Sequence, residues 1–571
     1  MKIASHRFQK CGRSAALTSV IWACSSVEAT SDLDQRLTRI VQNSPISLDN
    51  VTWCILDSEG APLSEYRANQ AMKPASTMKL LTTAAAFEHL PSLYQTKIWA
   101  HQSDQGVVLR WVGVGDPMMG DPRPLDNSRI PSTLLSQLAT EIRRAGITEV
   151  VRLEYDEGHF QGPRYHPNWP QEQFSKSYRC ESAALNFSGN LVRMELHPNS
   201  TKPKLQIFPS EANQIITLRE QFRDLKTTTK RDAVGFDRYP GRNEFRAFGV
   251  CRNHHVLESP VHDPARWAAE LLATSLRMDG IPVLQVDGIG TDNGPPKGKP
   301  ISSATINTPL FRVIKHCNTE SRNLYAECLL KSLDRHLGGY GSWLASGTDG
   351  RTAGERLLES LSILFPDSTS SSDVIDDGSG LSHNNRLTAR TLAHILSKAA
   401  TRDWYQEWLQ TLAEGRESGT LANRFKSKAF DHCMVRGKSG YISGASTLAG
   451  RIDQDDGQHL TFAIMVKDFK SNANAKLLHE AILAEAVREM SRVFQGDELL
   501  PAQSPSETIF STDRGRTSTN PAHQYVRLQS PGTDAPIHSS EKTTMRSDQR
   551  PSTFLLTGTG VVLILLGIRL S

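Results

Sequence analysis

Two side chains that could perform acyl transfer stand three residues apart in the stretch KPASTMKLLTTAAAF, residues 73–87. Residues three apart on a helix lie on the same face, so the amine of Lys79 can reach the hydroxyl of Ser76. A serine hydroxyl is a weak nucleophile until a base takes its proton, and a lysine kept neutral by its surroundings can be that base. The first turn of a helix also stabilises a developing negative charge. The spacing therefore predicts Ser76 as a nucleophile and Lys79 as its base.

The S-x-x-K spacing alone does not distinguish a nucleophile from an ordinary helix start. It is built from two common residue types, and this chain repeats it at Ser539 and Lys542, in a segment rich in Ser, Thr and Pro. The prediction for Ser76 therefore depends on whether further elements of an acyl-transfer site accompany it.

A second chemical element is the tripeptide Lys438-Ser439-Gly440, within VRGKSGYISG on a predicted strand. A lysine and a hydroxyl side by side can bind a substrate carboxylate. A glycine in a strand lets another backbone come close. This element predicts a binding strand for an extended, acidic substrate.

A third element has the form S-x-N, and spacing alone does not choose among its copies. Ser518 lies in the polar tail and Ser188 lies in a β-rich region. Ser321 stands just before an amphipathic helix and between the other two elements, so it is preferred, with a role in passing protons. Ser382 also lies between them and remains the competitor. The four copies are Ser188-Gly189-Asn190, Ser321-Arg322-Asn323, Ser382-His383-Asn384 and Ser518-Thr519-Asn520.

These elements must be positioned by a mixed α/β (α+β) fold. VTWCILD (residues 51–57) predicts a strand before the Ser76 helix, and helices are predicted within residues 262–280, 321–339, 352–365 and 388–400. Residues 432–468 predict three successive antiparallel strands, and residues 473–494 a closing helix. Between them, short apolar runs alternate with Gly, Pro and Asn turns, which predicts a mainly β region with few helices.

Taken together, the blocks resemble those of penicillin-binding D-alanyl-D-alanine carboxypeptidases and endopeptidases of the DacB type. These serine peptidases carry a large insert between their S-x-x-K and S-x-N motifs, and S-x-x-K, S-x-N and K-T-G are the motif set of penicillin-binding proteins. PASTMKLLTTAAAF, ESRNLYAECLLKSL, DDGSGLS and VRGKSGYISGASTLAG resemble the family's blocks in its order, as do GDPMMG and GPRYHPNWP within the insert. The resemblance covers roughly residues 50 to 490.

The resemblance implies a role for each matching residue. Ser76 is the acylated nucleophile and Lys79 its base, with backbone N–H groups of Ser76 and Tyr441 as the oxyanion hole. Ser321 and Asn323 form the second motif, with Asn323 binding the substrate amide. Two departures from the family pattern leave the reacting groups in place: Arg322 replaces an aspartate, and Ser439 replaces a threonine.

In the third motif, Lys438 and Ser439 bind the terminal carboxylate beside Gly440. The DDGSGLS block, with Asp377 and Ser379, is expected to shape the cleft wall. Asp156, in LEYDEGHF, stands where relatives hold an acidic residue near the rim; it would grasp the amine of the stem peptide, the alternative being a solvated loop carboxylate.

The same resemblance implies a β-lactamase/transpeptidase-like catalytic domain that is discontinuous in sequence. We expect it to comprise residues 30–100 and 300–497, interrupted by an inserted mainly-β region at 101–299.

Both ends of the chain predict export. Basic residues precede the uncharged run 14–27, which is typical of a signal peptide ending at residue 29. Residues 498–550 predict a flexible linker. The uncharged run 551–568, within the segment 551–571, is just long enough for a membrane anchor, and Arg569 favours the cytoplasmic side beyond it. The enzyme is therefore expected in the periplasm or on the outer face of the cytoplasmic membrane.

Composition excludes several other classes of function. A formal charge of +4 on 571 residues gives no support for nucleic-acid binding. His254, His255, His262 and Asp263 lack the spacing of a metal site, so neither a metal nor a cofactor is expected. Six of the eight cysteines lie beyond the predicted signal, without a dense disulfide pattern, and leave room for one or two disulfides.

The sequence thus predicts a serine-type D-Ala-D-Ala carboxypeptidase that acts on peptidoglycan stem peptides and is inhibited by β-lactams. Endopeptidase action on cross-links is a further prediction. The rival hypotheses are a serine β-lactamase, which would share the acylation step, and a catalytically silent module that binds the cell wall.

Overall fold

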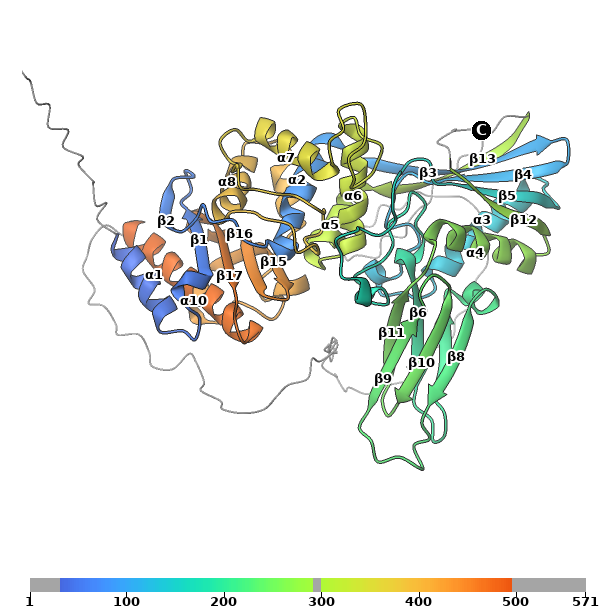
Figure 1. The fold of residues 1–571 in the computed structure, drawn as a ribbon, viewed down its shortest axis with the longest axis horizontal. Helices are drawn as coiled ribbons and strands as arrows, with labels where there is room; N and C mark the ends of the chain where they lie inside the picture. Colours follow the sequence, from blue (N-terminus) through green and yellow to red (C-terminus); the bar gives the residue numbers. More distant parts are fainter. Residues whose placement is uncertain (1–30, 291–298, 495–571) are drawn as a thin grey trace, which may run out of the picture.

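The computed structural model describes residues 31–290 and 299–494, which form two bodies joined side by side (Figure 1). The predicted signal peptide, linker and membrane anchor lie outside the described residues. Within the described ranges, no helix is long and apolar enough to cross a membrane.

The first body is built on a six-stranded antiparallel sheet that joins both ends of the described chain. Its order is β14-β15-β16-β17-β1-β2, and β1 pairs with β17 from Val51↔Val466 to Leu56↔Thr461. The predicted run of three antiparallel strands is confirmed. The strands are β1 (Val51–Leu56), β2 (Pro62–Tyr66), β14 (Ala413–Glu414), β15 (Cys433–Ile442), β16 (Ala445–Gln454) and β17 (His459–Lys467).

Helices cover both faces of this sheet, and alternate residues of β1 face opposite layers. Val51, Trp53 and Ile55 pack against α1 (Asp32–Gln42) and α10 (Asn472–Phe494), which lie side by side at the blue and red ends of the chain (Figure 1). Helix α1 begins at a capping box formed by Ser31 and Asp34. Cys54 and Leu56 face the opposite layer.

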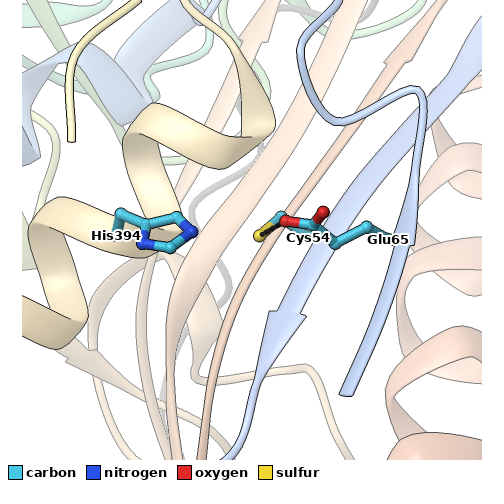
Figure 2. A group of neighbouring side chains, drawn as sticks. All are labelled: Cys54, Glu65 and His394. Atoms are coloured by element: carbon cyan, nitrogen blue, oxygen red, sulfur yellow. Dashed lines mark hydrogen bonds between the residues drawn. The ribbon is translucent and has the colours of Figure 1, made fainter. Parts of the chain in front are cut away.

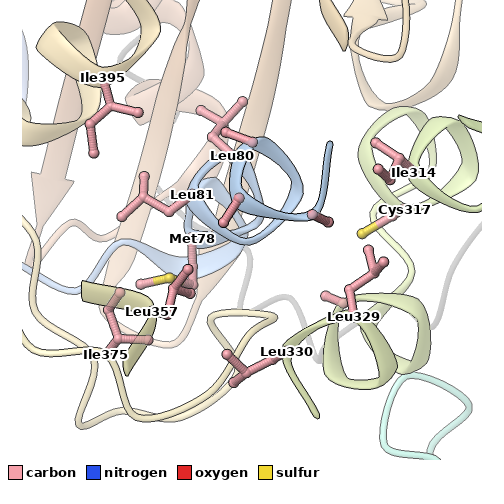
Figure 3. Close-up of a cluster of buried hydrophobic side chains, with 14 of the residues drawn as sticks. Met78, Leu80, Leu81, Ile314, Cys317, Leu329, Leu330, Leu357, Ile375 and Ile395 are labelled. Carbon is pink, nitrogen blue, oxygen red and sulfur yellow. The ribbon is translucent and has the colours of Figure 1, made fainter. Parts of the chain in front are cut away.

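That opposite layer contains α2 (Met78–His89), the helix that follows Ser76. Residues Met78 to Ala86 are all buried, and the small Ala84, Ala85 and Ala86 allow neighbouring helices to come close. Figure 3 shows Met78, Leu80 and Leu81 of α2 packed among side chains of the surrounding helices. A helix surrounded in this way is held rigidly. The other helices of the layer are α5 (Leu310–Thr319), α6 (Asn323–His336), α7 (Ala353–Leu364), α8 (Ala389–Ala399) and α9 (Tyr405–Leu409).

The second body lies between α2 and α5 in the sequence and contains three sheets. A five-stranded sheet has the order β12-β5-β4-β3-β13, and its strands are β3 (Leu93–Ser103), β4 (Gly106–Val112), β5 (Val150–Asp156), β12 (Val283–Ile289) and β13 (Lys299–Pro309). The long strands β3 and β13 pair antiparallel, with β13 at the edge of the sheet, so the chain leaves and returns along one ribbon. The predicted domain boundary near residue 100 falls inside β3.

Two three-stranded sheets complete this body. They have the orders β11-β6-β7 and β8-β10-β9. Their strands are β6 (Leu191–His197), β7 (Lys204–Phe208), β8 (Thr217–Phe222), β9 (Ala233–Arg238), β10 (Glu244–Val250) and β11 (His255–Pro260).

Two helices pack on the five-stranded sheet. Helix α4 (Pro264–Met278) begins after Asp263, whose side chain accepts from the N–H of Arg266, and it ends before Gly280 at φ +80°, as the sequence predicts. Helix α3 (Ile130–Arg144) was not predicted. Its apolar residues follow the helical period, but the only start signal is Pro131, because no side chain caps its first turn.

Within residues 31–290 and 299–494, the cysteines do not form the disulfides for which the sequence leaves room. Cys54, Cys180, Cys251, Cys317, Cys328 and Cys433 are all buried free thiols. They are distributed over three separate hydrophobic clusters, so burial rather than pairing accounts for them.

Candidate active site

Ser76 lies in a short 3-10 turn, Ala75–Thr77, that leads directly into α2. Its side chain is half-buried. The hydroxyls of Thr77 and Thr447 both donate to the carbonyl of Pro74, at 2.6 and 2.7 Å, and so fasten the turn to β16. The turn is held between the sheet and the loop after α7, with Ser76 at its centre.

Lys79 is completely buried and its amine meets three acceptors. Nζ lies 3.0 Å from Oγ of Ser76, 2.7 Å from Oδ1 of Asn323 and 2.7 Å from the carbonyl oxygen of Ser379. Burial lowers the pKa of Lys79 from 10.5 to about 8, against the opposing charges of Cys317, Glu327 and Asp377. The 3.0 Å distance between Nζ of Lys79 and Oγ of Ser76 confirms that these side chains, three residues apart, meet as the helix periodicity requires.

The geometry around Lys79 suits either protonation state of the amine. A protonated ammonium has three N–H groups for its three acceptors. When one proton is lost, the lone pair can accept from the hydroxyl of Ser76, which reverses the direction of that hydrogen bond. The neutral lysine is thereby aligned to take the serine proton.

Among the S-x-N asparagines within the described residues, Asn323 is the one that contacts Lys79. Asn323 is the first residue of α6, and its Nδ2 donates to the carbonyl of Tyr178 at 3.0 Å. Ser321, two residues earlier, is half-buried with a left-handed backbone (φ +61°). The amide of Asn323 therefore joins the Lys79 centre to the second body.

The competing copies have other places in the fold. Ser382 is buried; its hydroxyl donates to Asp376 and accepts from the N–H of Asn384, so it forms part of a turn. Ser188 and Asn190 form a buried turn, where the Nδ2 of Asn190 donates to the carbonyl of Glu181. Ser518, Ser539 and Lys542 lie outside the described residues.

The third element lies on β15, beside the turn that carries Ser76. A Cβ added at Gly440 would stand 2.2 Å from Oγ1 of Thr447 and 2.8 Å from the backbone nitrogen of Ser76. Only a glycine permits this approach. Tyr441, the next residue, is 57% exposed. The K-S-G strand and the nucleophile turn are thus in direct contact.

Lys438 is completely buried, and its Nζ donates to the carbonyl of Ser439 at 2.9 Å. Burial, and then the charge of Lys79, hold the pKa of Lys438 well below its ordinary value. The hydroxyl of Ser439 is half-buried and donates to Oγ1 of Thr420 at 2.9 Å. Two buried amines that oppose each other's charge make a place where a substrate carboxylate is favourable.

The DDGSGLS loop forms a wall of the site through its backbone. The carboxylate of Asp377 is buried and accepts from the N–H groups of Gly380 (2.7 Å) and Ser382 (2.6 Å) and from Nε1 of Trp169 (2.8 Å). This places the carbonyl of Ser379 toward Lys79. Asp377 therefore acts as a structural carboxylate, in agreement with the wall role expected of it.

Sequence reasoning missed a second buried carboxylate, that of Glu327 on α6. Its oxygens accept from the N–H groups of Gly378 (3.2 Å) and Ser379 (2.9 Å) and from Nε1 of Trp343 (2.8 Å). Burial, followed by the charge of Asp377, raises the pKa of Glu327 to about 8. Its only sequence signal is a charge on the apolar face of a predicted helix.

Asp156 lies at the end of β5 and is 1% exposed. Its Oδ1 accepts from the N–H of Gly158 at 2.8 Å. The alternative of a solvated loop carboxylate is wrong, because the residue is buried within the five-stranded sheet. Contact with a substrate amine stays a prediction.

The histidines considered as metal ligands have separate neighbours. His255 pairs with Asp232 at 2.9 Å, His262 pairs with Glu181 at 2.8 Å, and Asp263 caps α4. The ring of His254 lies 4.7 Å from that of His197.

The comparison with protein families decides the class of the chain. The model of the D-Ala-D-Ala carboxypeptidase 3 (S13) family matches residues 33–487. The chain belongs to the S13 family. S13 members are serine-type D-Ala-D-Ala carboxypeptidases, which is the enzyme class that the sequence motifs predict.

Individual relatives agree with the family match. The D-alanyl-D-alanine carboxypeptidase of Actinomadura sp. (strain R39) is 27% identical over 428 residues, covering 71% of this chain and 75% of that protein. The D-alanyl-D-alanine carboxypeptidase DacB of Haemophilus influenzae is 22% identical over 428 residues, covering 72% of this chain and 83% of that protein. Each alignment therefore covers most of this chain and most of the relative.

A solved structure shares the fold. The crystal structure of penicillin binding protein 4 (dacB) from Haemophilus influenzae has a TM-score of 0.60 and 18% identity, and covers 80% of this chain and 98% of that one. The same protein complexed with a β-lactam gives a TM-score of 0.58. The fold class predicted from the S13-like motif blocks is confirmed.

Proposed function

We propose that this S13 enzyme hydrolyses the terminal D-Ala-D-Ala bond of peptidoglycan stem peptides through an acyl-enzyme at Ser76. The observation that carries the proposal is the contact of Nζ of the buried Lys79 with both Oγ of Ser76 and Oδ1 of Asn323. A base, a nucleophile and a substrate-binding amide then share one centre. Metal is not needed for any step of this acyl transfer.

Acylation begins when neutral Lys79 takes the proton of Ser76 and Oγ attacks the carbonyl of the penultimate D-alanine. The negative oxygen that develops is stabilised by backbone N–H groups of Ser76 and Tyr441. Collapse of the intermediate breaks the peptide bond, and the departing D-alanine amine receives a proton through the hydroxyl of Ser321. Water then attacks the ester, with Lys79 again as base, and releases the shortened peptide.

Substrate orientation follows from the two motifs beside the nucleophile. The C-terminal carboxylate of the peptide binds at Lys438 and Ser439, where it offsets the positive charge of the buried amine. The peptide backbone lies along β15 past Gly440, and its amide is bound by Asn323. This places the scissile bond over Ser76.

Location follows from the substrate. Peptidoglycan lies outside the cytoplasmic membrane, so a cell-wall peptidase is exported. The signal peptide (1–29) and the C-terminal anchor (551–571) stay predictions of the sequence, and with them the attachment to the membrane surface.

Labelling with a fluorescent penicillin tests the proposal. We expect a stable adduct on the purified protein that is absent from Ser76→Ala. Rapid turnover of the label would instead identify a β-lactamase, and absence of any adduct a silent wall-binding module.

Incubation with a stem pentapeptide tests the substrate. We expect release of free D-alanine at a rate that falls below detection in Ser76→Ala. A cross-linked muropeptide dimer, assayed in parallel, tests the predicted endopeptidase action. An intact pentapeptide in the presence of penicillin-reactive enzyme would refute the carboxypeptidase assignment.

A further inference from the structure

Three potential metal ligands meet outside the active site, where α8 packs on the central sheet. Cys54 on β1 and Glu65 on β2 are direct partners in the antiparallel register, so their side chains stand on the same face. Figure 2 shows the imidazole of His394, from α8, pointing toward these two. The thiol, the carboxylate and the imidazole place one atom each within 4.8 Å of one another.

These three side chains place polar atoms within a layer of the fold that is otherwise mostly apolar. Cys54 is completely buried among apolar side chains of the cluster beneath α8. Its thiol donates to Oε1 of Glu65 at 3.1 Å. The Nε2 atom of His394 is buried and has no hydrogen-bond partner among residues 31–290 and 299–494. A buried polar atom without a partner costs free energy, which a bound cation would offset.

The donor set selects the kind of cation. A thiolate, an imidazole and a carboxylate are ligands of zinc, whereas Ca²⁺ and Mg²⁺ are bound by oxygen atoms alone. Zinc bonds of about 2.0 to 2.3 Å put neighbouring ligands roughly 3.5 Å apart. The sulfur–oxygen separation of 3.1 Å is close to that spacing, and the ligand atom of His394 lies within 4.8 Å of both.

A neighbouring charge orients the carboxylate for this role. Arg390 forms an ion pair with Oε2 of Glu65, which leaves Oε1 directed at Cys54. Such an outer partner orients a ligating carboxylate.

We propose that Cys54, Glu65 and His394 form a zinc site that ties α8 to β1 and β2. Binding forms bonds from zinc to Sγ, one carboxylate oxygen and one ring nitrogen, and water occupies the fourth position. The Cys54 thiol loses its proton to solvent in this step, because a coordinating thiol is deprotonated. The sequence predicted no metal, since the three ligands are 11 and 329 residues apart and only the tertiary packing brings them together.

The site is expected to act on stability and not on the acylation chemistry. The N–H of Arg390 donates to the carbonyl of Ala68, and Leu387 exchanges backbone hydrogen bonds with Met72. Helix α8 is therefore joined to the segment that leads to Ser76, but the ligands themselves stand apart from the Lys79 centre. Zinc that binds only the folded chain stabilises it by mass action.

Cobalt titration of the chelator-treated full-length protein tests this proposal. We expect one equivalent of Co²⁺ to produce a thiolate-to-metal absorption band, with release of about one proton, and an excess of Zn²⁺ to remove the band. Cys54→Ser and His394→Gln should each lose the band and weaken zinc affinity more than about 100-fold, beyond the loss from an outer partner. Cys251→Ser, a change at another buried thiol, should keep both.

A second cluster, Glu195, His197 and His254, supplies the competing assignment. Loss of cobalt binding in His254→Gln with unchanged cobalt binding in Cys54→Ser would overturn the proposal, as would a titration of the wild type without a thiolate band. Fluorescent penicillin labelling of Cys54→Ser and His394→Gln verifies their fold. Unaltered labelling with lost cobalt binding separates this inference from the proposed function, which does not depend on zinc.

Discussion

The pH dependence of acylation follows from the burial of Lys79. Only the neutral amine can take the Ser76 proton, and burial lowers the pKa of this lysine from 10.5 to about 8. At pH 7, roughly one molecule in ten then carries the neutral amine, against roughly one in 3,000 at the ordinary value. Burial therefore enlarges the reactive population about 300-fold at this pH.

The assay measures the acylation rate constant at saturating penicillin between about pH 5.5 and about pH 9. Because deprotonation activates the base, the rate constant should rise about tenfold per pH unit below pH 7 and level off above about pH 8. Loss of the charge on Lys438, whose pKa burial holds well below its ordinary value, should instead weaken the apparent affinity for the acidic substrate as the pH rises. The pH dependence of the rate constant therefore reports on Lys79, and the pH dependence of the affinity reports on Lys438.

Glu327 supplies the necessary control, because its pKa is also raised to about 8. Glu327→Gln cannot titrate, so the rising limb should persist in that variant if Lys79 causes it. A rate constant that is flat between pH 6 and pH 8, or a limb that vanishes in Glu327→Gln, would refute the assignment of Lys79 as the titrating base.

Four substitutions test the neighbouring contacts. Gly440→Ala places a Cβ 2.8 Å from the nitrogen of Ser76. It should slow acylation by about tenfold to 100-fold in stopped-flow assays, because a shift of the nucleophile of about 1 Å is enough to lower the rate by this much. Gly437→Ala, on the same strand, is the control and should lower the stability of the fold without slowing acylation. Asn323→Ala should slow acylation at least tenfold, whereas Ser382→Ala should lower the unfolding free energy by about 1 kcal/mol in urea and keep the rate. Equal effects of the last two would show that the second motif is misassigned.

The elements of the fold were largely predictable wherever local signals agree. The strands within residues 432–468 are runs of strand-forming residues separated by turns, and α4 has a capping Asp263 and a terminating Gly280, so both were predicted with their bounds nearly correct. Helix α3 was missed because it lacks a side-chain cap. The joining of β1 to β17 is invisible to local patterns, since about 400 residues separate the partners.

In the candidate site, too, local motifs were predictable from the sequence and contacts between distant segments were not. S-x-x-K and K-S-G are each contiguous, so spacing along one helix or strand predicts their geometry. The choice of Asn323 over the other S-x-N asparagines depended on order along the chain, and it acquires a physical reason only from the bond to Lys79. Glu327 and the backbone carbonyl of Ser379 belong to no motif, because a buried carboxylate and a main-chain oxygen have no distinctive spacing.

By itself, then, the sequence determined the kinds of chemistry present: a hydroxyl, two amines and an amide in the order of an acyl-transfer enzyme. Only the tertiary structure decided the burial, the contacts and the pKa values of those groups. It buries Lys79 so that the pKa falls, packs Gly440 onto the nitrogen of Ser76, and brings Cys54, Glu65 and His394 to one point. Burial and contact arise from segments far apart in the chain, and a pKa or a ligand cluster is a property of that packing.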